Sequence, residues 1–228
     1  MEENENKIEE TQENKQESEF KKQTANVINE AKEQMKNINI KEEAEKGKNL
    51  FLKLFKEPIK TIKEIAQDEQ NKTQKTAIIL IIIWVVSVLF RQIIFYATSK
   101  YYDFDFLDTL KVILSPVLVI AGMTVSIYFL NKNSKKSISR IITSVTIAKI
   151  PTIVSSLVVY LNYIHSKVYN LTDPIRTFLS IISMVIMYFT VKFLFEENDD
   201  ETAVKQFVKV EAIYYVIAFI ISFFGITM

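Results

Sequence analysis

The sequence predicts an all-α membrane protein, a polytopic transmembrane helical bundle with five spans, preceded by an amphipathic helix and a disordered polar tail. Three observations predict this class. The apolar residues of the 228-residue chain fall into five blocks, each close to the roughly 20 residues that cross a bilayer. The first block contains AIILIIIWVVSVLF, which lacks the polar stripe of a soluble helix. Most charged residues lie before and between the blocks.

Residues 1–48 are predicted to form a disordered or weakly helical cytosolic tail. The segment is rich in Glu, Lys, Asn and Gln and has Phe20 as its only aromatic residue. It can bury too little apolar surface to offset the entropy lost on ordering. It begins MEENENKIEETQENK, without the basic and apolar regions of a secretory signal peptide. The tail is therefore expected to stay in the cytosol, where it offers a binding segment for a protein partner.

Residues 49–75 are predicted to form an amphipathic region at the membrane surface. Apolar residues recur at helical spacing, and Pro58 suits the first turn of a second short helix. Flanking lysines favour contact with an anionic inner leaflet; these are Lys48, Lys53, Lys56, Lys60 and Lys63. The alternative is a cytosolic helix packed on the loops of the bundle. The residues expected to contact the membrane are Leu50, Phe51, Leu54, Phe55, Pro58 and Ile62.

Residues 76–228 are predicted to form the transmembrane domain. The expected spans are residues 76–97, 107–130, 138–164, 174–195 and 203–228. The last span carries Lys205, Lys209 and Glu211 in its first half. The segments before the first span and between the second and third hold most of the nearby lysines and arginines, which places them inside. Five crossings then put the N-terminus in the cytosol and the C-terminus outside.

Charged side chains within the spans are the candidate functional residues, because such charges are costly and usually face the bundle interior or water. Lys149 and Glu211 lie at similar depths from the cytosolic side and are predicted to face each other. Pro151 is expected to kink the helix beside Lys149 and to free backbone carbonyls. Lys149 then forms a structural pair, lines a small polar cavity, or extends toward the headgroups.

A second pair is predicted nearer the outer side. It joins Arg91 in the first span to Asp105 or Asp108 at the start of the second. The serines of the third and fourth spans, Ser180 and Ser183 among them, are interpreted as packing contacts.

The composition argues against catalysis. The chain has no cysteine and a single histidine, His165, which excludes disulfides, thiolate metal sites and the commonest metal and triad constellations. Its three glycines are isolated, so there is no nucleotide-binding loop. We therefore predict no enzyme activity, no cofactor and no metal. The net charge of +1 also gives no reason to expect nucleic acid as a partner.

The order of these features resembles the Yip (Ypt-interacting protein) domain family of small five-span membrane proteins. The resemblance rests on LFKEPIKTIKEI with Pro58 ahead of the first span, and on SRIITSVTIAKIPTIVSSLVVY with Ala148 and Pro151 in the third. It covers about residues 50–228, including the charged link into the last span. It implies a helical membrane bundle without enzymatic activity. Eukaryotic members look like trafficking factors that bind small GTPases and shape membranes, but the acidic motifs of their tails are not evident in this chain.

Two functions from different classes follow. The first is a membrane scaffold or interaction protein, in which the amphipathic region contacts the leaflet and the tail recruits a partner. The second is a small transporter or channel subunit whose path is lined by Lys149, Glu211 and Arg91. High usage of Ile, Lys and Asn with little Gly is typical of a bacterial protein from an AT-rich genome, which predicts the bacterial plasma membrane. A homo-oligomer is compatible with the sequence.

Overall fold

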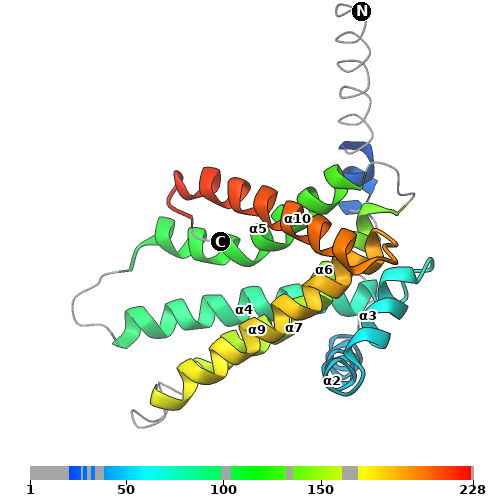
Figure 1. The fold of residues 1–228 in the computed structure, drawn as a ribbon. Coiled ribbons are helices and arrows are strands. Elements are labelled where there is room, and N and C mark those ends of the chain that lie inside the picture. Colours follow the sequence, from blue (N-terminus) through cyan, green and yellow to red (C-terminus); the bar gives the residue numbers. More distant parts are fainter. Residues whose placement is uncertain are drawn as a thin grey trace, which may run out of the picture.

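The fold is all-helical, and no strand occurs in the described part of the chain. The structure is a computed structural model that describes residues 21–26, 28–29, 32–33, 39–98, 104–131, 136–160 and 169–226. Figure 1 shows the arrangement of its principal helices, which are α2 (Ile40–Lys56), α3 (Pro58–Gln67), α4 (Gln74–Thr98), α5 (Phe106–Leu130), α6 (Ile138–Ala148), α7 (Ile150–Val158), α9 (Tyr169–Leu194) and α10 (Asp200–Ser222). The predicted fold class is therefore confirmed at the level of an all-α protein.

Three of the described helices are long and apolar enough to cross a membrane, namely α4, α5 and α9 from Thr172 onward. The pair α6 and α7 adds a fourth if it is counted as one broken span. These helices indicate a membrane protein. The helix α10 carries more charge than these candidate spans. Every 18-residue stretch of it contains Lys205, Lys209 and Glu211, so it does not count among the helices apolar enough to cross a membrane. Five spans thus remain a prediction.

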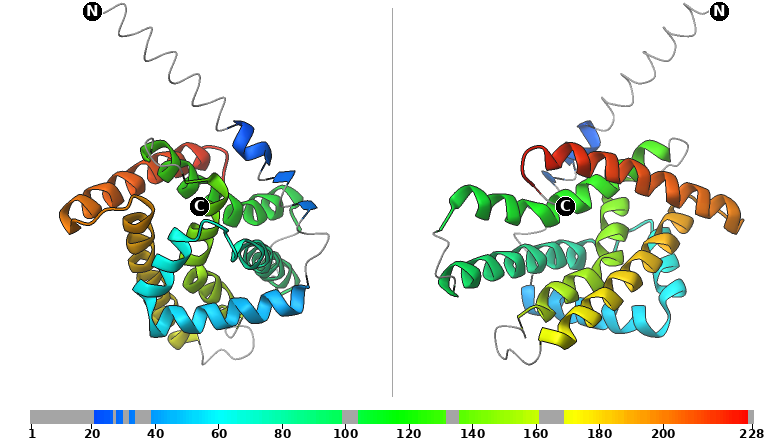
Figure 2. Two further views of the ribbon diagram at one scale, coloured as in Figure 1. Left: turned by 90° about the vertical axis from the view of Figure 1, so that its right-hand side faces the viewer. Right: turned by 60° about the vertical axis from the view of Figure 1, so that its left-hand side comes forward.

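The candidate spans pack side by side, and α10 covers α5 and α9. One end of the bundle is where α4, α6 and α10 begin and where α5 and α9 end. The helices α2 and α3 are attached there, at the right-hand side of Figure 1, so we call it the α2–α3 end. In the left view of Figure 2, α4 is seen end-on while α2 extends across the bundle. The predicted amphipathic region is therefore two helices fixed to the bundle.

The helix α2 starts earlier than the sequence predicts. Asn39 caps it, because its side-chain oxygen accepts a hydrogen bond from the Glu42 amide at 3.3 Å. Residues 40–48, predicted to belong to the disordered or weakly helical tail, therefore form the first half of a 17-residue helix. The predicted disorder of residues 1–20 lies outside the described residues.

Close packing and a buried carboxylate attach α2 to α4. A side chain at Gly47 would bring its Cβ to 3.3 Å from Leu80, so glycine permits the close approach. Glu43 is buried, and its carboxylate accepts hydrogen bonds from Thr76 Oγ1 at 2.7 Å and Lys46 Nζ at 2.8 Å. Burial acts to raise the pKa of Glu43, but these hydrogen bonds and the nearby lysine charges outweigh it and hold the pKa below 4.5. The carboxylate therefore stays charged and bound at neutral pH.

The helix α3 closes the bundle against α6 and α9. Pro58 occupies its first turn as the sequence predicts. Its inward face joins the hydrophobic core of the bundle, together with residues such as Trp84 of α4; the buried residues of α3 are Thr61, Ile62, Ile65 and Ala66. The apolar face of α3 thus packs on protein.

Polar contacts from the segment between α5 and α6 fix the same end to α9. Asn131 Nδ2 donates to the Leu194 carbonyl at 3.0 Å, and Lys136 Nζ donates to the Phe193 carbonyl at 3.0 Å. Lys136 also lies 3.0 Å from Glu196. These bonds satisfy the last carbonyls of α9, which have no partner within their own helix.

Candidate functional site

The third predicted span is broken at Lys149. Helix α6 ends at Ala148, α7 begins at Ile150, and the two axes differ by 43°. Pro151 causes the break, because it has no N–H to donate to the carbonyl four residues earlier and its ring crowds that carbonyl. The Lys149 amide ends α6 with hydrogen bonds to the carbonyls of Val145 and Thr146, both at 3.1 Å. The kink predicted beside Lys149 is present.

A hydroxyl from α9 bonds to the backbone at the break. Ser183 Oγ donates to the Ala148 carbonyl at 3.0 Å and accepts from Thr152 Oγ1 at 3.0 Å. A carbonyl beside the predicted kink is therefore bonded to Ser183, a residue that the sequence marks only as a packing contact. Helical spacing gives no sign of this bond, because the acceptor and the donor lie 35 positions apart and meet only when α7 packs on α9.

We expect Ser183→Ala to destabilise the bundle by about 1–2 kcal/mol, because it leaves the buried end of α6 without this donor. The matched control is Ser180→Ala on the same helix, where the side chain is exposed. Thermal denaturation of both variants in the same detergent measures the difference. Equal midpoints for the two variants would show that the Ser183 hydroxyl does not support the break.

Lys149 and Glu211 attract each other across the bundle but do not form a close ion pair. Both side chains are half-buried, and each contributes to the electrostatic environment of the other. Among the described residues, no carboxylate lies within 4.0 Å of the Lys149 ammonium, and it makes no hydrogen bond. The predicted pairing is therefore a longer-range interaction, because α10 packs on α5 and α9 instead of directly on the break.

The predicted outer pair is absent from the described residues. Arg91 is half-buried in α4. Asp105 caps α5 by accepting hydrogen bonds from the amides of Leu107 at 2.8 Å and Asp108 at 3.1 Å. Asp108 is exposed and lies 3.8 Å from Lys111 on its own helix. Both carboxylates therefore interact within α5, and the prediction that one of them pairs with Arg91 is wrong.

The predicted membrane-surface residues face in different directions. Leu54 and Ile62 are 2% and 1% exposed and belong to the bundle core. Leu50, Phe51 and Pro58 are half-buried. Only Phe55 of the predicted set is exposed, with 45% of its surface accessible. The leaflet-facing interpretation therefore fails for most of the set, because α2 and α3 use that face to pack on the bundle.

A second apolar surface on α2 and α3 replaces the predicted one. We call it the outer face, and it consists of Leu52, Phe55 and Ile59, which are exposed by nearly half. Leu52 is not among the predicted membrane-surface residues, because it falls outside the Leu50 and Leu54 spacing that marks the packed side. Exposed lysines surround the outer face; these are Lys53, Lys56, Lys60 and Lys63.

The described residues contain no cluster of three or more His, Cys, Asp or Glu side chains that would hold a metal ion. Two features thus stand out as candidate sites, namely the break with its lysine and the outer face with its lysines.

Comparison with models of protein families, with curated proteins and with solved structures gave no match.

Proposed function

We propose that the chain is a non-enzymatic membrane scaffold of the Yip type, in which α2 and α3 form a rigid platform at the cytosolic surface of a five-span bundle. The observation that carries the proposal is the two-sided character of this pair of helices. One side is buried in the bundle core through Leu54 and Ile62, while the outer face stays accessible. A platform fixed in this way keeps its orientation relative to the membrane.

The dimensions and surface of α10 support a fifth span. Its 23 residues give a length of about 34 Å, enough for the roughly 30 Å hydrocarbon core. Large apolar side chains cover its second half and are exposed, as expected for a surface in lipid; these are Tyr215, Val216, Phe219, Ile220 and Phe223. Its charged first half lies at the α2–α3 end, where α5 and α9 end.

The outer face has the composition of an interfacial surface. Phe55 and Leu52 are exposed three residues apart on α2, and Ile59 follows in the first turn of α3. Apolar side chains of this kind enter the boundary between headgroups and acyl chains by about 5–10 Å. Each surrounding lysine near an anionic leaflet adds about 1 kcal/mol of attraction. The tail before α2 then lies next to the membrane, where it is available to a protein partner.

The experiment measures the depth of the outer face in a bilayer. The chain has no cysteine, so a single Phe55→Cys substitution carries one nitroxide label without other changes. In vesicles containing anionic phospholipid, we expect the label to be relaxed by oxygen and protected from a water-soluble nickel complex. The control is Glu42→Cys, an exposed position of α2 that lies about 140° around the helix from Phe55. Equal nickel accessibility at both positions would rule out membrane contact by the outer face.

A second function, a transport path, is favoured by one observation. The Lys149 ammonium lies at the break of a span without a hydrogen bond or ion pair to any described residue, and Glu211 is the carboxylate that attracts it. Charges inside spans mark ion and substrate pathways in many membrane proteins. The transport function requires both charges, whereas the platform does not.

A further inference from the structure

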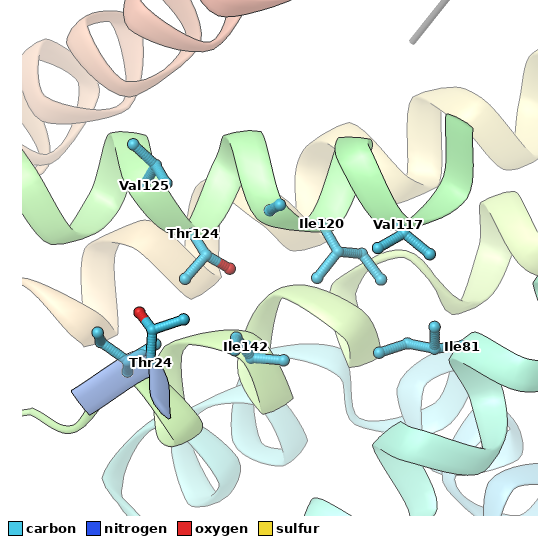
Figure 3. Close-up of a pocket in the computed structure, with 9 residues that line it drawn as sticks. Thr24, Ile81, Val117, Ile120, Thr124, Val125 and Ile142 are labelled. Atoms are coloured by element: carbon cyan, nitrogen blue, oxygen red, sulfur yellow. The ribbon is translucent and has the colours of Figure 1, made fainter. Parts of the chain in front are cut away.

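An apolar pocket opens between α4, α5 and α6 (Figure 3). It lies in the half of the bundle nearer the α2–α3 end, because its lining includes the first turns of α6 and Thr124 near the end of α5. Its volume is about 220 Å³. Ile81 of α4 and Ile142 of α6 form its walls together with a stretch of α5 that includes Val117, Ile120 and Thr124. Thr24, from the segment 21–26, lies at one side of it. An apolar cavity of roughly 150 Å³ already stays dry and binds benzene, so this pocket suits a hydrocarbon ligand.

The pocket connects the outside of the bundle with its interior. Val117 and Ala121 lie one turn apart on α5 and are exposed. Ile120 and Thr124 lie one turn apart on the neighbouring side and are buried. The opening therefore faces sideways, in the direction in which a span meets acyl chains. A ligand can enter from the bilayer without passing through water.

Thr124 supplies a polar group that the protein itself does not satisfy. Its side chain is 3% exposed, and its hydroxyl has no hydrogen-bond partner. Figure 3 shows the side chain extending from α5 into the space before α6. Several buried hydroxyls of the spans donate to the carbonyl four residues earlier in their own helix, as Ser126, Thr146 and Thr190 do. Thr143 and Ser144 of α6 lack a partner, as Thr124 does, but of these three only Thr124 lines the pocket. The hydroxyl oxygen itself is enclosed, so it reaches a ligand in the pocket by rotation about the Cα–Cβ bond of Thr124.

We propose that the pocket holds one acyl chain of a bilayer phospholipid, and that the ester carbonyl of this lipid accepts a hydrogen bond from the Thr124 hydroxyl. Thr124 lies about 9 Å from the end of α5, because it precedes Leu130 by six residues. An α5 of about 37 Å exceeds the roughly 30 Å hydrocarbon core, so this hydroxyl lies a few ångströms below the ester groups of the leaflet. The apolar lining from Ile120 to Val117 continues away from that leaflet and accommodates the chain.

The lipid-binding proposal rests on the proposed function in one respect, because both require the bundle to span a bilayer. It does not depend on the outer face or on a protein partner. A failure of the label at position 55 to enter the membrane would therefore leave the lipid pocket intact, and an empty pocket would leave the platform intact.

The experiment compares lipid retention by native mass spectrometry of the full chain after exchange into mild detergent. Ala121→Phe places a ring at the opening of the pocket, and its matched control is Ala97→Phe at an exposed alanine of α4. We expect the wild-type chain and Ala97→Phe to keep a bound phospholipid and Ala121→Phe to lose it. Thr124→Val, which removes the hydroxyl while keeping the side-chain size, is expected to lose the lipid at a lower detergent concentration than the wild-type chain.

Three outcomes would overturn the proposal or part of it. Equal retention in wild type and Ala121→Phe would place the bound lipid elsewhere. A wild-type chain without bound phospholipid would show that the pocket is empty or is filled by the N-terminal segment that contributes Thr24. Equal retention by Thr124→Val and wild type would overturn the hydrogen bond to the ester carbonyl.

Discussion

Ile62→Ala is expected to lower the free energy of unfolding by about 2–5 kcal/mol, the usual cost of truncating a large side chain in a packed core. Ile62 is 1% exposed and belongs to the core cluster that joins α3 to the bundle. The space left by the shortened side chain lies under α3, a helix of 10 residues that has little stability of its own. The substitution should therefore release α3 first and loosen the platform.

The same helix supplies the control. Ile59→Ala removes the same atoms from a side chain that is 49% exposed on the outer face, so its effect on stability should stay within about 0.5 kcal/mol. Thermal denaturation in detergent gives the global effect, and hydrogen exchange of the α3 amides gives the local one. Similar exchange in the two variants would contradict the packing of α3 on the bundle and, with it, the rigid platform.

The second large effect concerns Lys149 and Glu211. Glu211→Met alone is expected to cost about 1–3 kcal/mol, a value between those of exposed and fully buried ion pairs, because it leaves Lys149 without the carboxylate that attracts it. Adding Lys149→Met should recover most of this loss, since the remaining uncompensated charge is removed. The control is Lys209→Met, which removes an exposed charge from the same helix.

A double-mutant cycle measures this coupling from the four denaturation midpoints. If the losses of the single variants simply add in the double variant, the two charges do not interact and the electrostatic link is wrong. The stable double variant also separates the two functions. Flux of protons or anions into vesicles with the wild-type chain, lost in the double variant, would favour the transport path over the scaffold. A double variant that keeps the depth of the label at position 55 is expected for a scaffold.

The elements that were predicted well are those governed by local chemistry. The blocks 76–97 and 107–130 correspond closely to α4 and α5, because a long apolar block forms a helix wherever it packs. Pro58 begins α3 and Pro151 breaks the third span, since a proline changes the backbone regardless of its neighbours. The start of α2 was missed because its apolar residues are sparse before Leu50, and the helix depends on Gly47 and Glu43 meeting α4.

The sequence by itself determined the all-helical class, the candidate spans and the position of the kink, because each depends on residues within one or two helical turns. Only the tertiary structure decided which apolar residues of α2 and α3 face the bundle, which hydroxyl bonds to the broken backbone, and which unpartnered hydroxyl lies beside the pocket. Leu54 and Phe55 are adjacent and both apolar, yet one lies in the core and the other is exposed. That difference arises from the packing of α2 and α3 on distant helices, which spacing along one helix does not encode.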